Sequence, residues 1–244
     1  MLGGVARVLG MDLSEAAEPV DAHRSLADLF TRALRPGLRE WPAEPDVAGS
    51  PVDGVVGQWG GITDDTALQA KGRPYSVAEL LDDARLAPRF EGGAYLTIYL
   101  SPRHYHRIHA PISGHIGRAR PIPGRLLPVN RPAITSIDRL FPRNERLVAL
   151  LEDSPLGAVA VVAIGAFNVG RITAAFDDRL ATNRPRARAE TRLYHPPVPI
   201  ARGQELMTFH LGSTVVLLFE PRAALRAPTP GTEIRVGEPV AGGG

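Results

Sequence analysis

The sequence of 244 residues contains no cysteine and a single lysine, Lys71. The first absence excludes disulfide bonds, thiolate nucleophiles and metal sites ligated by cysteine. The second leaves only Lys71 to hold pyridoxal phosphate as a Schiff base. Almost all of the positive charge is therefore carried by arginine, whose guanidinium group binds phosphate through paired donors.

Long apolar runs are also missing. No stretch approaches the length of a membrane-spanning helix, and the N-terminus lacks the basic start and apolar core of a signal peptide. We therefore expect a protein that is soluble or that lies on a membrane surface. Aromatic residues make up only 6% of the chain, and no recognition helix or base-stacking motif is present. Nucleic acid is accordingly not a predicted partner.

Acidic residues are absent from a long central stretch. Between Gly92 and Ile137 the chain carries six arginines and no carboxylate. A second basic stretch, from Arg184 to Arg192, holds four arginines against Glu190 alone. These stretches predict contact with an anionic partner, such as lipid headgroups or a phosphorylated substrate, or simply a solvated basic surface.

The element pattern predicts an α+β, mainly β protein with an antiparallel β-sandwich or barrel-like core and short N-terminal helices. Residues 1–49 are expected to form a helical, membrane-proximal segment, and residues 50–244 a β-rich catalytic domain. Ser25 and Ser76 are the expected helix-capping residues. Prolines and glycines punctuate many short elements. The clearest strand-length runs are 94–100, 158–164 and 215–219.

Two segments carry the candidate chemistry. Tyr99 to Pro111 places three histidines within six positions, and Leu211 to Thr214 sets a serine directly after a glycine. A hydroxyl nucleophile beside a base can attack a carbonyl. In one interpretation that carbonyl belongs to the chain itself, at Gly212, and the outcome is self-processing.

Two other interpretations remain open on the residues alone. The spacing of His104, His106 and His109 is compatible with zinc or iron ligation, completed by a carboxylate from elsewhere in the chain. Asp53 and Asp138 are the candidates for that carboxylate. A Ser-His-Asp hydrolase is less well supported, because the glycine-flanked elbow that presents the nucleophile is missing after Ser213.

Seven short stretches occur in a characteristic order. They are Phe30 to Gly37, Ser50 to Gly54, Tyr99 to Pro111, Pro128-Val129-Asn130, Asn144-Glu145-Arg146, Val161 to Ile172, and Leu211 to Thr214. Together they make the chain similar to the bacterial and mitochondrial type of phosphatidylserine decarboxylase, a pyruvoyl-dependent family. The resemblance runs from about residue 25 to the C-terminus.

This resemblance implies that Asp53, His109 and Ser213 are the catalytic residues. Asp53 would orient His109, which takes the proton from the Ser213 hydroxyl. Attack on Gly212 and elimination would then divide the chain into residues 1–212 and 213–244. A covalent pyruvoyl group derived from Ser213 would accept electrons when CO₂ leaves the substrate. His106, Arg103 and Arg107 are the expected substrate-binding residues, and no metal is expected.

The resemblance also implies a substrate and a cellular location. The expected reaction converts phosphatidylserine to phosphatidylethanolamine, a step of phospholipid biosynthesis, at the cytoplasmic side of the cell membrane. The protein would be peripheral, and its two cleaved chains would form a heterodimer that could dimerise further. A smaller amino acid is the alternative substrate, and a non-catalytic lipid-binding module is the alternative class.

Two positions depart from the family pattern. His104 stands where members usually carry aspartate, which alters the charge beside the expected active site. Most of the apolar leading helices of the family are also expected to be lacking, and the apolar residues within Met1 to Met11 are expected to be the end of a helix that approaches the bilayer.

Overall fold

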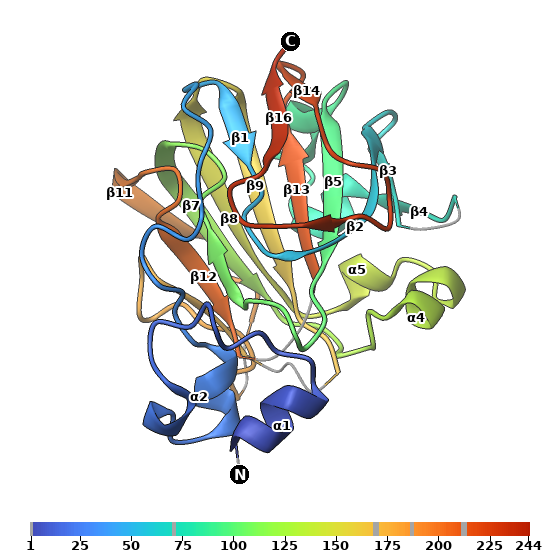
Figure 1. The fold of residues 1–244 in the computed structure, drawn as a ribbon. Helices are drawn as coiled ribbons and strands as arrows, with labels where there is room; N and C mark the ends of the chain where they lie inside the picture. The colour runs from blue at the N-terminus through green and yellow to red at the C-terminus, as the bar shows by residue number, and fades with distance from the viewer. Residues whose placement is uncertain (1, 70–71, 168–170, 186–187, 211–213) are drawn as a thin grey trace.

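An eight-stranded antiparallel sheet organises the chain (Figure 1). The computed structural model describes residues 2–69, 72–167, 171–185, 188–210 and 214–244. Within these ranges the strand order of the large sheet is β11-β7-β8-β9-β13-β5-β2-β15. Smaller sheets have the orders β10-β12-β6, β1-β16-β14 and β3-β4. The predicted mainly β, antiparallel fold is confirmed, as a sandwich-like arrangement without a closed barrel.

The helices are short and lie outside the sheets. They are α1 (Leu2–Val8), η1 (Val20–Ala22), α2 (Leu26–Phe30), α3 (Val77–Leu81), η2 (Ala87–Phe90), α4 (Arg131–Ser136) and α5 (Leu140–Arg143). As predicted, the hydroxyls of Ser25 and Ser76 cap α2 and α3 by accepting the N–H groups of Asp28 and Glu79. Helices α4 and α5 were not predicted.

The strands hold more residues than the helices do. They are β1 (Val47–Gly49), β2 (Gly54–Gly61), β3 (Thr66–Leu68), β4 (Pro74–Ser76), β5 (Ala94–Tyr99), β6 (Arg107–His109), β7 (Gly114–Ile122), β8 (Arg146–Ser154), β9 (Gly157–Ile164), β10 (Ile172–Ala174), β11 (Arg192–Ile200), β12 (Glu205–Phe209), β13 (Thr214–Phe219), β14 (Ala223–Leu225), β15 (Glu233–Ile234) and β16 (Pro239–Gly243). The three runs expected to be strands correspond to β5, β9 and β13.

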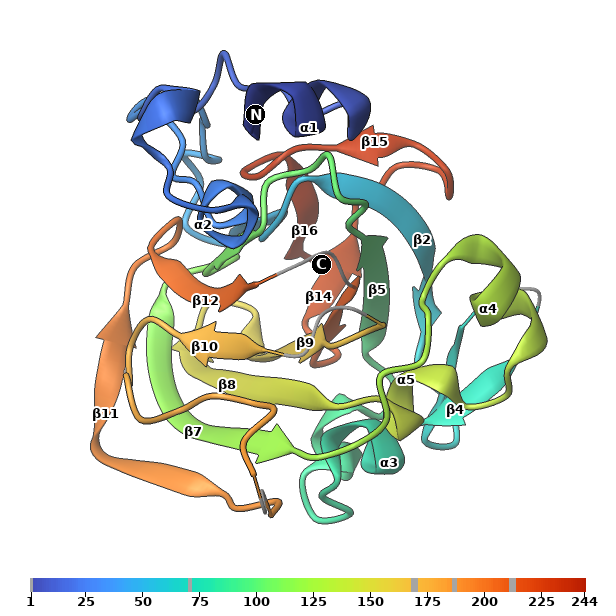
Figure 2. The same cartoon turned by 90° about the horizontal axis from the view of Figure 1, so that it is seen from below.

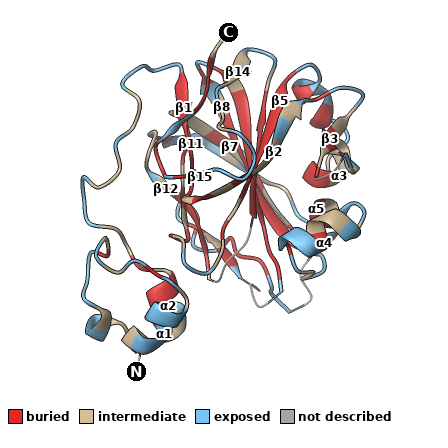
Figure 3. Cartoon of the chain, turned by 45° about the vertical axis from the view of Figure 1, so that its right-hand side comes forward, coloured by how far each residue is buried: buried red, intermediate tan, exposed pale blue. Residues whose placement is uncertain are grey.

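The large sheet curves around the sheet of β10, β12 and β6, as the view from below shows (Figure 2). Strands β8, β9 and β13 read as continuous apolar runs because they are covered on both faces. All six residues of β13 are buried between β5 and β9. In Figure 3, these strands are coloured largely as buried.

The N-terminal helices form a small unit of their own beside the sheets (Figure 3). Ala6, Met11 and Leu29 are its buried centre, and partly buried leucines surround them. Val8 on α1 points outward and is 87% exposed. Within the described ranges, no helix is long and apolar enough to cross a membrane.

Candidate active site

Strand register brings the predicted catalytic segments to one end of the large sheet. Val55 of β2 pairs with Tyr99 of β5, and Tyr99 pairs with Thr214 of β13. Asp53 precedes this row by two residues, and the histidine segment leaves β5 just after it. Leu211, Gly212 and Ser213 lie outside the described residues. The strand that directly follows the predicted cleavage site therefore starts beside the segments that hold Asp53 and the histidines.

The smaller sheet fixes the histidines against the same end. The backbone carbonyl of His106 accepts the N–H of Phe209, the last residue of β12. The backbone N–H of His109 donates to the carbonyl of Pro51 at 2.9 Å, which ties β6 to the segment before Asp53. His109 also faces Glu205 across the β6–β12 pair.

His109 is held through both ring nitrogens. Its Nδ1 lies 2.7 Å from the carbonyl oxygen of Gly203, and its Nε2 lies 2.9 Å from the hydroxyl of Tyr105. A carbonyl oxygen only accepts, so Nδ1 carries the proton and Nε2 is the basic nitrogen. Gly203 has a φ of +82°, and a Cβ there would lie 2.8 Å from Nε1 of Trp41, so only glycine can present this carbonyl.

The environment of His109 favours the neutral base. Burial lowers the pKa of His109 below its ordinary value, and the charges of Glu205 and Asp53 oppose that shift in part. The ring also stacks on Tyr105, with centroids 5.6 Å apart. A neutral imidazole, whose Nε2 carries a lone pair, is the form that can accept a proton from a hydroxyl.

Asp53 does not touch His109 among the described residues. Its carboxylate accepts hydrogen bonds from Arg39, with Oδ2 2.6 Å from Nη2, and from the backbone N–H of Val236. Arg39 in turn pairs with Glu15 at 2.7 Å. The expected direct contact between Asp53 and His109 is therefore absent from the described hydrogen bonds, and the catalytic role of Asp53 stays a prediction.

His106 is fully buried and neither ring nitrogen has a partner among the described residues. The ring packs edge-on against Phe30, with centroids 5.1 Å apart. Burial, together with the nearby charge of Arg32, lowers the pKa of His106 to about 3. Buried polar atoms are normally hydrogen-bonded, so the two free nitrogens indicate a group that interacts with something outside the described contacts.

The three histidines do not converge on one point. His104 directs Nδ1 at the backbone N–H of Ser101, 2.9 Å away, whereas His109 is engaged by Tyr105 and Gly203. In the part of the chain that the structure describes, no group of three or more His, Asp or Glu side chains could hold a metal ion. The described residues therefore do not provide the group of ligands that the metal-dependent interpretation requires. His104 stands where the family pattern has aspartate, and its Nδ1 accepts the hydrogen bond from Ser101.

Arg103 and Arg107, the predicted substrate-binding residues, both have carboxylate partners. Arg103 forms an ion pair with Glu233, and Nη1 of Arg107 lies 2.8 Å from Oε2 of Glu205. Other arginines of the acid-free stretch pair in the same way with acids from elsewhere, such as Arg118 with Asp83. The stretch is therefore largely neutralised by acids from other parts of the chain, and the binding role of Arg103 and Arg107 stays a prediction.

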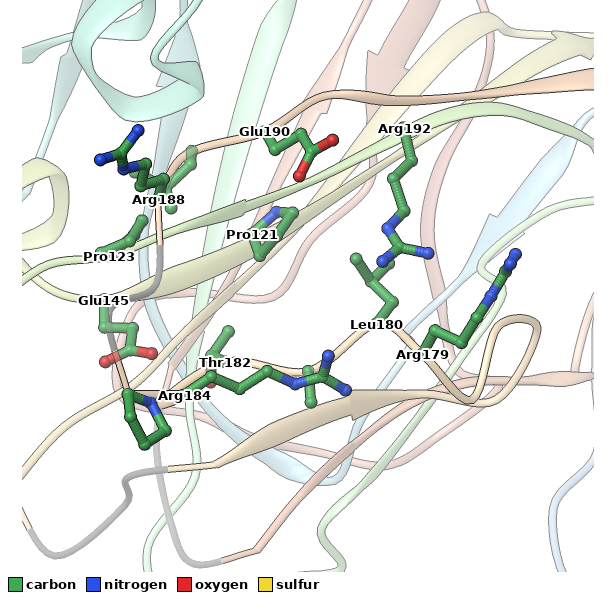
Figure 4. Close-up of a pocket in the computed structure, with 13 residues that line it drawn as sticks. Pro121, Pro123, Glu145, Arg179, Leu180, Thr182, Arg184, Arg188, Glu190 and Arg192 are labelled. Atoms are coloured by element: carbon green, nitrogen blue, oxygen red, sulfur yellow. The ribbon is translucent and has the colours of Figure 1, made fainter.

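The second basic stretch lines a pocket of about 190 Å³ (Figure 4). Arg192 and Arg179 pair there with Asp177. Arg184 and Arg188 are exposed and have no carboxylate partner among the described residues. Glu145, on the same pocket, accepts the backbone N–H of Asn183, and burial raises its pKa. Since Arg146 and Thr214 both pair with Ile164, this pocket lies near the end of the sheet where β13 starts.

The sequence did not single out Tyr105, Arg32 or Arg39 as parts of the site. Tyr105 precedes His109 by four residues, inside the segment that had already been recognised. Arg32 lies in the early stretch from Phe30 to Gly37, which carried the resemblance without an assigned role. Arg39 follows that stretch, and only the fold brings it to Asp53.

Residues 26–242 match a family model described as phosphatidylserine decarboxylase. The chain is 48% identical over 240 residues to a phosphatidylserine decarboxylase proenzyme of Anaeromyxobacter sp. (strain K), covering 97% of this chain and 84% of that relative. It is 45% identical over 217 residues to a proenzyme of the same name from Myxococcus xanthus (strain DK1622), covering 89% and 76%. A third such proenzyme, from Brevibacillus brevis, is 41% identical over 211 residues, covering 86% and 75%.

Proposed function

This chain belongs to the phosphatidylserine decarboxylase family, and we propose that it is a proenzyme that cleaves itself between Gly212 and Ser213. The mature enzyme would then convert phosphatidylserine to phosphatidylethanolamine and CO₂. The observation that carries the proposal is the position of His109. Burial lowers the pKa of its imidazole, the Gly203 carbonyl fixes the tautomer, and its segment follows β5, which pairs with the strand that begins after the cleavage site.

In the cleavage step, His109 acts as the general base. Its Nε2 accepts the proton of the Ser213 hydroxyl, and the Ser213 oxygen attacks the carbonyl carbon of Gly212. The acyl group moves from nitrogen to oxygen, and the resulting ester breaks by elimination to leave dehydroalanine at position 213. Water hydrolyses this group, so ammonia is released and a pyruvoyl group remains. Asp53 supports the step by holding the segment next to His109, through Arg39 and Val236.

The surroundings suit a pyruvoyl group at position 213. When present, its carbonyl would condense with the substrate amine and draw electrons from the carbon that loses CO₂. His106 lies beside Phe209, near the end of β12, with two buried ring nitrogens that lack partners among the described residues. We assign His106 to the orientation of the substrate carboxylate or to the return of a proton to the carbon. Arg103 and Arg107 remain proposed contacts for the headgroup.

The two chains of the mature enzyme would stay together as a heterodimer. Strand β13 begins just after the cleavage site and pairs with both β5 and β9, which belong to the other chain. Strands β15 and β16 of the C-terminal chain pair with β2 and β1. The proposed cut therefore falls within a shared set of sheets, with residues 1–49 as the membrane-proximal segment and the rest as the catalytic domain.

We also propose a peripheral position at the cytoplasmic face of the cell membrane. Apolar and basic side chains occur together at the active-site end of the molecule. Phe167, three residues beyond the end of β9, is 65% exposed, and Val8 of α1 is 87% exposed. Arg184 and Arg188 have no carboxylate partner among the described residues, and their positive charge attracts anionic lipid headgroups.

Intact-mass analysis of purified protein tests the cleavage. We expect two chains, the smaller of which begins with a pyruvoyl group in place of a free amine. Ser213→Ala should remain a single chain, while Thr214→Val, which removes the neighbouring hydroxyl, should still be cut. An intact wild-type chain that releases CO₂ from phosphatidylserine would contradict the proposal.

Activity assays separate the proposal from its alternatives. The pyruvoyl mechanism predicts inactivation by hydroxylamine, or by borohydride with substrate, and no effect of chelators. CO₂ release should be faster from phosphatidylserine vesicles than from free serine or aromatic amino acids. Faster turnover of a free amino acid would overturn the substrate and leave the mechanism in place. Vesicle binding without any CO₂ release would indicate a lipid-binding module.

A further inference from the structure

Arg32 is a buried arginine that forms no ion pair with a carboxylate among the described residues. Arg32 is only 4% exposed, and it follows Thr31, which is the residue after helix α2. The hydrogen bond described for its guanidinium is a long one, from Nη2 to the carbonyl oxygen of Arg103 at 3.4 Å. Nε and Nη1 are buried without a partner among the described residues. Because a guanidinium group stays protonated in proteins, this charge is buried without a hydrogen-bonded carboxylate among the described residues, and the nearby charges of Asp53 and Glu15 offset only part of the cost of burial.

Arg32 and His106 lie close together beside the proposed reaction centre. The backbone carbonyl of Thr31 accepts the Nε–H of Arg107, so residues 30–32 run along the histidine segment. Phe30 packs on the His106 ring, and the charge of Arg32 helps to lower the pKa of His106. His106 in turn is bonded to the last residue of β12 through its carbonyl. Two polar atoms on each of these side chains are thus buried without a hydrogen-bond partner among the described residues.

Arg32 also borders a cavity of about 270 Å³ that reaches the active-site segment. Asp53, Arg103, His104 and Tyr105 are further lining residues. The carboxylates on this cavity already have partners among the described residues. Glu15 and Asp53 pair with Arg39, and Glu233 pairs with Arg103, whereas Asp12 and Glu238 accept hydrogen bonds from the backbone N–H groups of Ser14 and Arg235. Arg103 and Arg235 are each paired with a carboxylate, so Arg32 is the lining arginine that forms no ion pair among the described residues.

On the basis of the proposed function, we propose that the guanidinium of Arg32 binds the phosphodiester of the phosphatidylserine headgroup. The substrate offers two anions, the phosphodiester and the carboxylate. A cation held against the carboxylate would stabilise the ground state, and this interaction would be lost as neutral CO₂ departs. The phosphodiester keeps its charge throughout the reaction, so binding to Arg32 costs nothing in the chemical step. Its oxygens suit a guanidinium, which donates through paired N–H groups.

Melting temperature measures this binding without any catalysis. In the single-chain Ser213→Ala protein, we expect glycerophosphoserine and glycerophosphoethanolamine to raise the melting temperature, and free serine to leave it unchanged. Adding Arg32→Gln should abolish the rise. Adding Arg235→Gln should preserve it, because Arg235 borders the same cavity but pairs with Glu15. An equal rise in the Arg32→Gln protein would overturn the proposal. A rise with serine but not with glycerophosphoethanolamine would assign Arg32 to the carboxylate and overturn the phosphodiester assignment.

Stability separates binding from a structural role. A buried charge without a partner destabilises the fold, so Arg32→Met in the Ser213→Ala background should melt at the same or a higher temperature than its parent. A clear drop in melting temperature would indicate that Arg32 supports the fold, and would contradict its assignment as an unpaired binding group. These measurements need no cleavage, so they stand apart from the test of the proposed function.

Kinetics of the mature enzyme provide the third readout. We expect Arg32→Gln to raise KM for phosphatidylserine at least tenfold while kcat changes less, and Arg32→Lys to recover part of the loss. A fall in kcat with an unchanged KM would contradict a role in headgroup binding. If no variant and no wild-type protein releases CO₂, the proposed function fails, and the melting experiment alone decides the role of Arg32.

Discussion

The hydroxyl of Tyr105 lies 2.9 Å from Nε2 of His109, the nitrogen proposed to take the proton of Ser213. Burial raises the pKa of Tyr105, so its hydroxyl remains protonated and donates to the imidazole. The lone pair that serves as the base is therefore already engaged in this structure. For the cleavage to proceed, the Ser213 hydroxyl must take over the place that Tyr105 holds.

We predict that Tyr105→Phe still cleaves itself. The variant keeps the ring that stacks on His109 and loses only the hydroxyl, while the Gly203 carbonyl still fixes the tautomer. Removing a donor to the neutral imidazole should raise the pKa of His109, so cleavage should begin to slow at a higher pH than in the wild type. The measurement follows chain cleavage by gel after unfolded precursor is diluted from urea into buffers of different pH. Complete loss of cleavage would show that the hydroxyl takes part in the reaction.

We predict that the wild-type cleavage rate is nearly constant from pH 8 to pH 6.5. An ordinary histidine is half protonated near pH 6.5. Because burial lowers the pKa of His109, its neutral form should persist below that pH, and the rate should fall only under more acidic conditions. The same refolding assay gives the profile. His109→Gln, which cannot accept the proton as a base, should remain uncleaved at every pH, and a half-maximal rate at or above pH 6.5 would contradict the prediction.

The fold class and three central strands could be predicted from local patterns, because β5, β9 and β13 are apolar runs of strand length with turn residues at their ends. Capping serines likewise predicted α2 and α3. The pairing that places β13 between β5 and β9 could not be read from these runs, since many strand orders satisfy the same burial pattern. Helices α4 and α5 are only six and four residues long, too short for an apolar periodicity to stand out.

The histidine segment of the site could be predicted from the sequence, but the ion pairing of its arginines could not. The acid-free stretch suggested free arginines, yet Arg103 pairs with Glu233, 130 residues further along the chain. The reverse holds for Arg32, which follows helix α2 and forms no ion pair with a carboxylate among the described residues. Linear charge density cannot reveal either outcome, because ion pairs depend on which segments the topology brings together.

We predict that acid weakens the fold partly through His106. With a pKa of about 3 in the folded state, His106 stays neutral while the unfolded chain binds a proton near pH 6.5. Its contribution to stability is therefore complete above pH 6.5 and is lost as the pH falls toward 3, at up to about 1.4 kcal/mol per pH unit. Between pH 7.5 and pH 5 the loss from this group should be about 2 kcal/mol.

Urea unfolding of the Ser213→Ala protein at the two pH values measures this loss. His106→Gln should be less sensitive to acid than its parent, since the amide does not titrate. His104 and His109 also have lowered pKa values and act in the same direction, so the difference between parent and variant isolates His106. An identical acid sensitivity in the two proteins would show that His106 is accessible to protons in the folded state.

We predict that Arg184 and Arg188 help to hold the protein on anionic membranes. Both are exposed at the end of the sheet where β13 starts, and neither has a carboxylate partner among the described residues. An arginine near an anionic surface contributes about 1 kcal/mol. The double variant Arg184→Gln/Arg188→Gln should therefore bind phosphatidylglycerol vesicles roughly 30-fold more weakly, a loss of about 2 kcal/mol. Co-sedimentation at low and high salt measures the effect, which should shrink as salt screens the charges.

A second double variant controls for the change in net charge. Arg222 and Arg226 are also exposed, but they flank β14 and follow Phe219, at the opposite end of β13 from Thr214. Arg222→Gln/Arg226→Gln removes the same charge and should leave vesicle binding within about twofold, because these side chains lie away from the proposed membrane face. Phe167→Ser should weaken binding at both salt concentrations, since its contribution is apolar and is not screened. Equal losses in the two double variants would mean that net charge alone drives binding and that the active-site end has no preferred contact with the membrane.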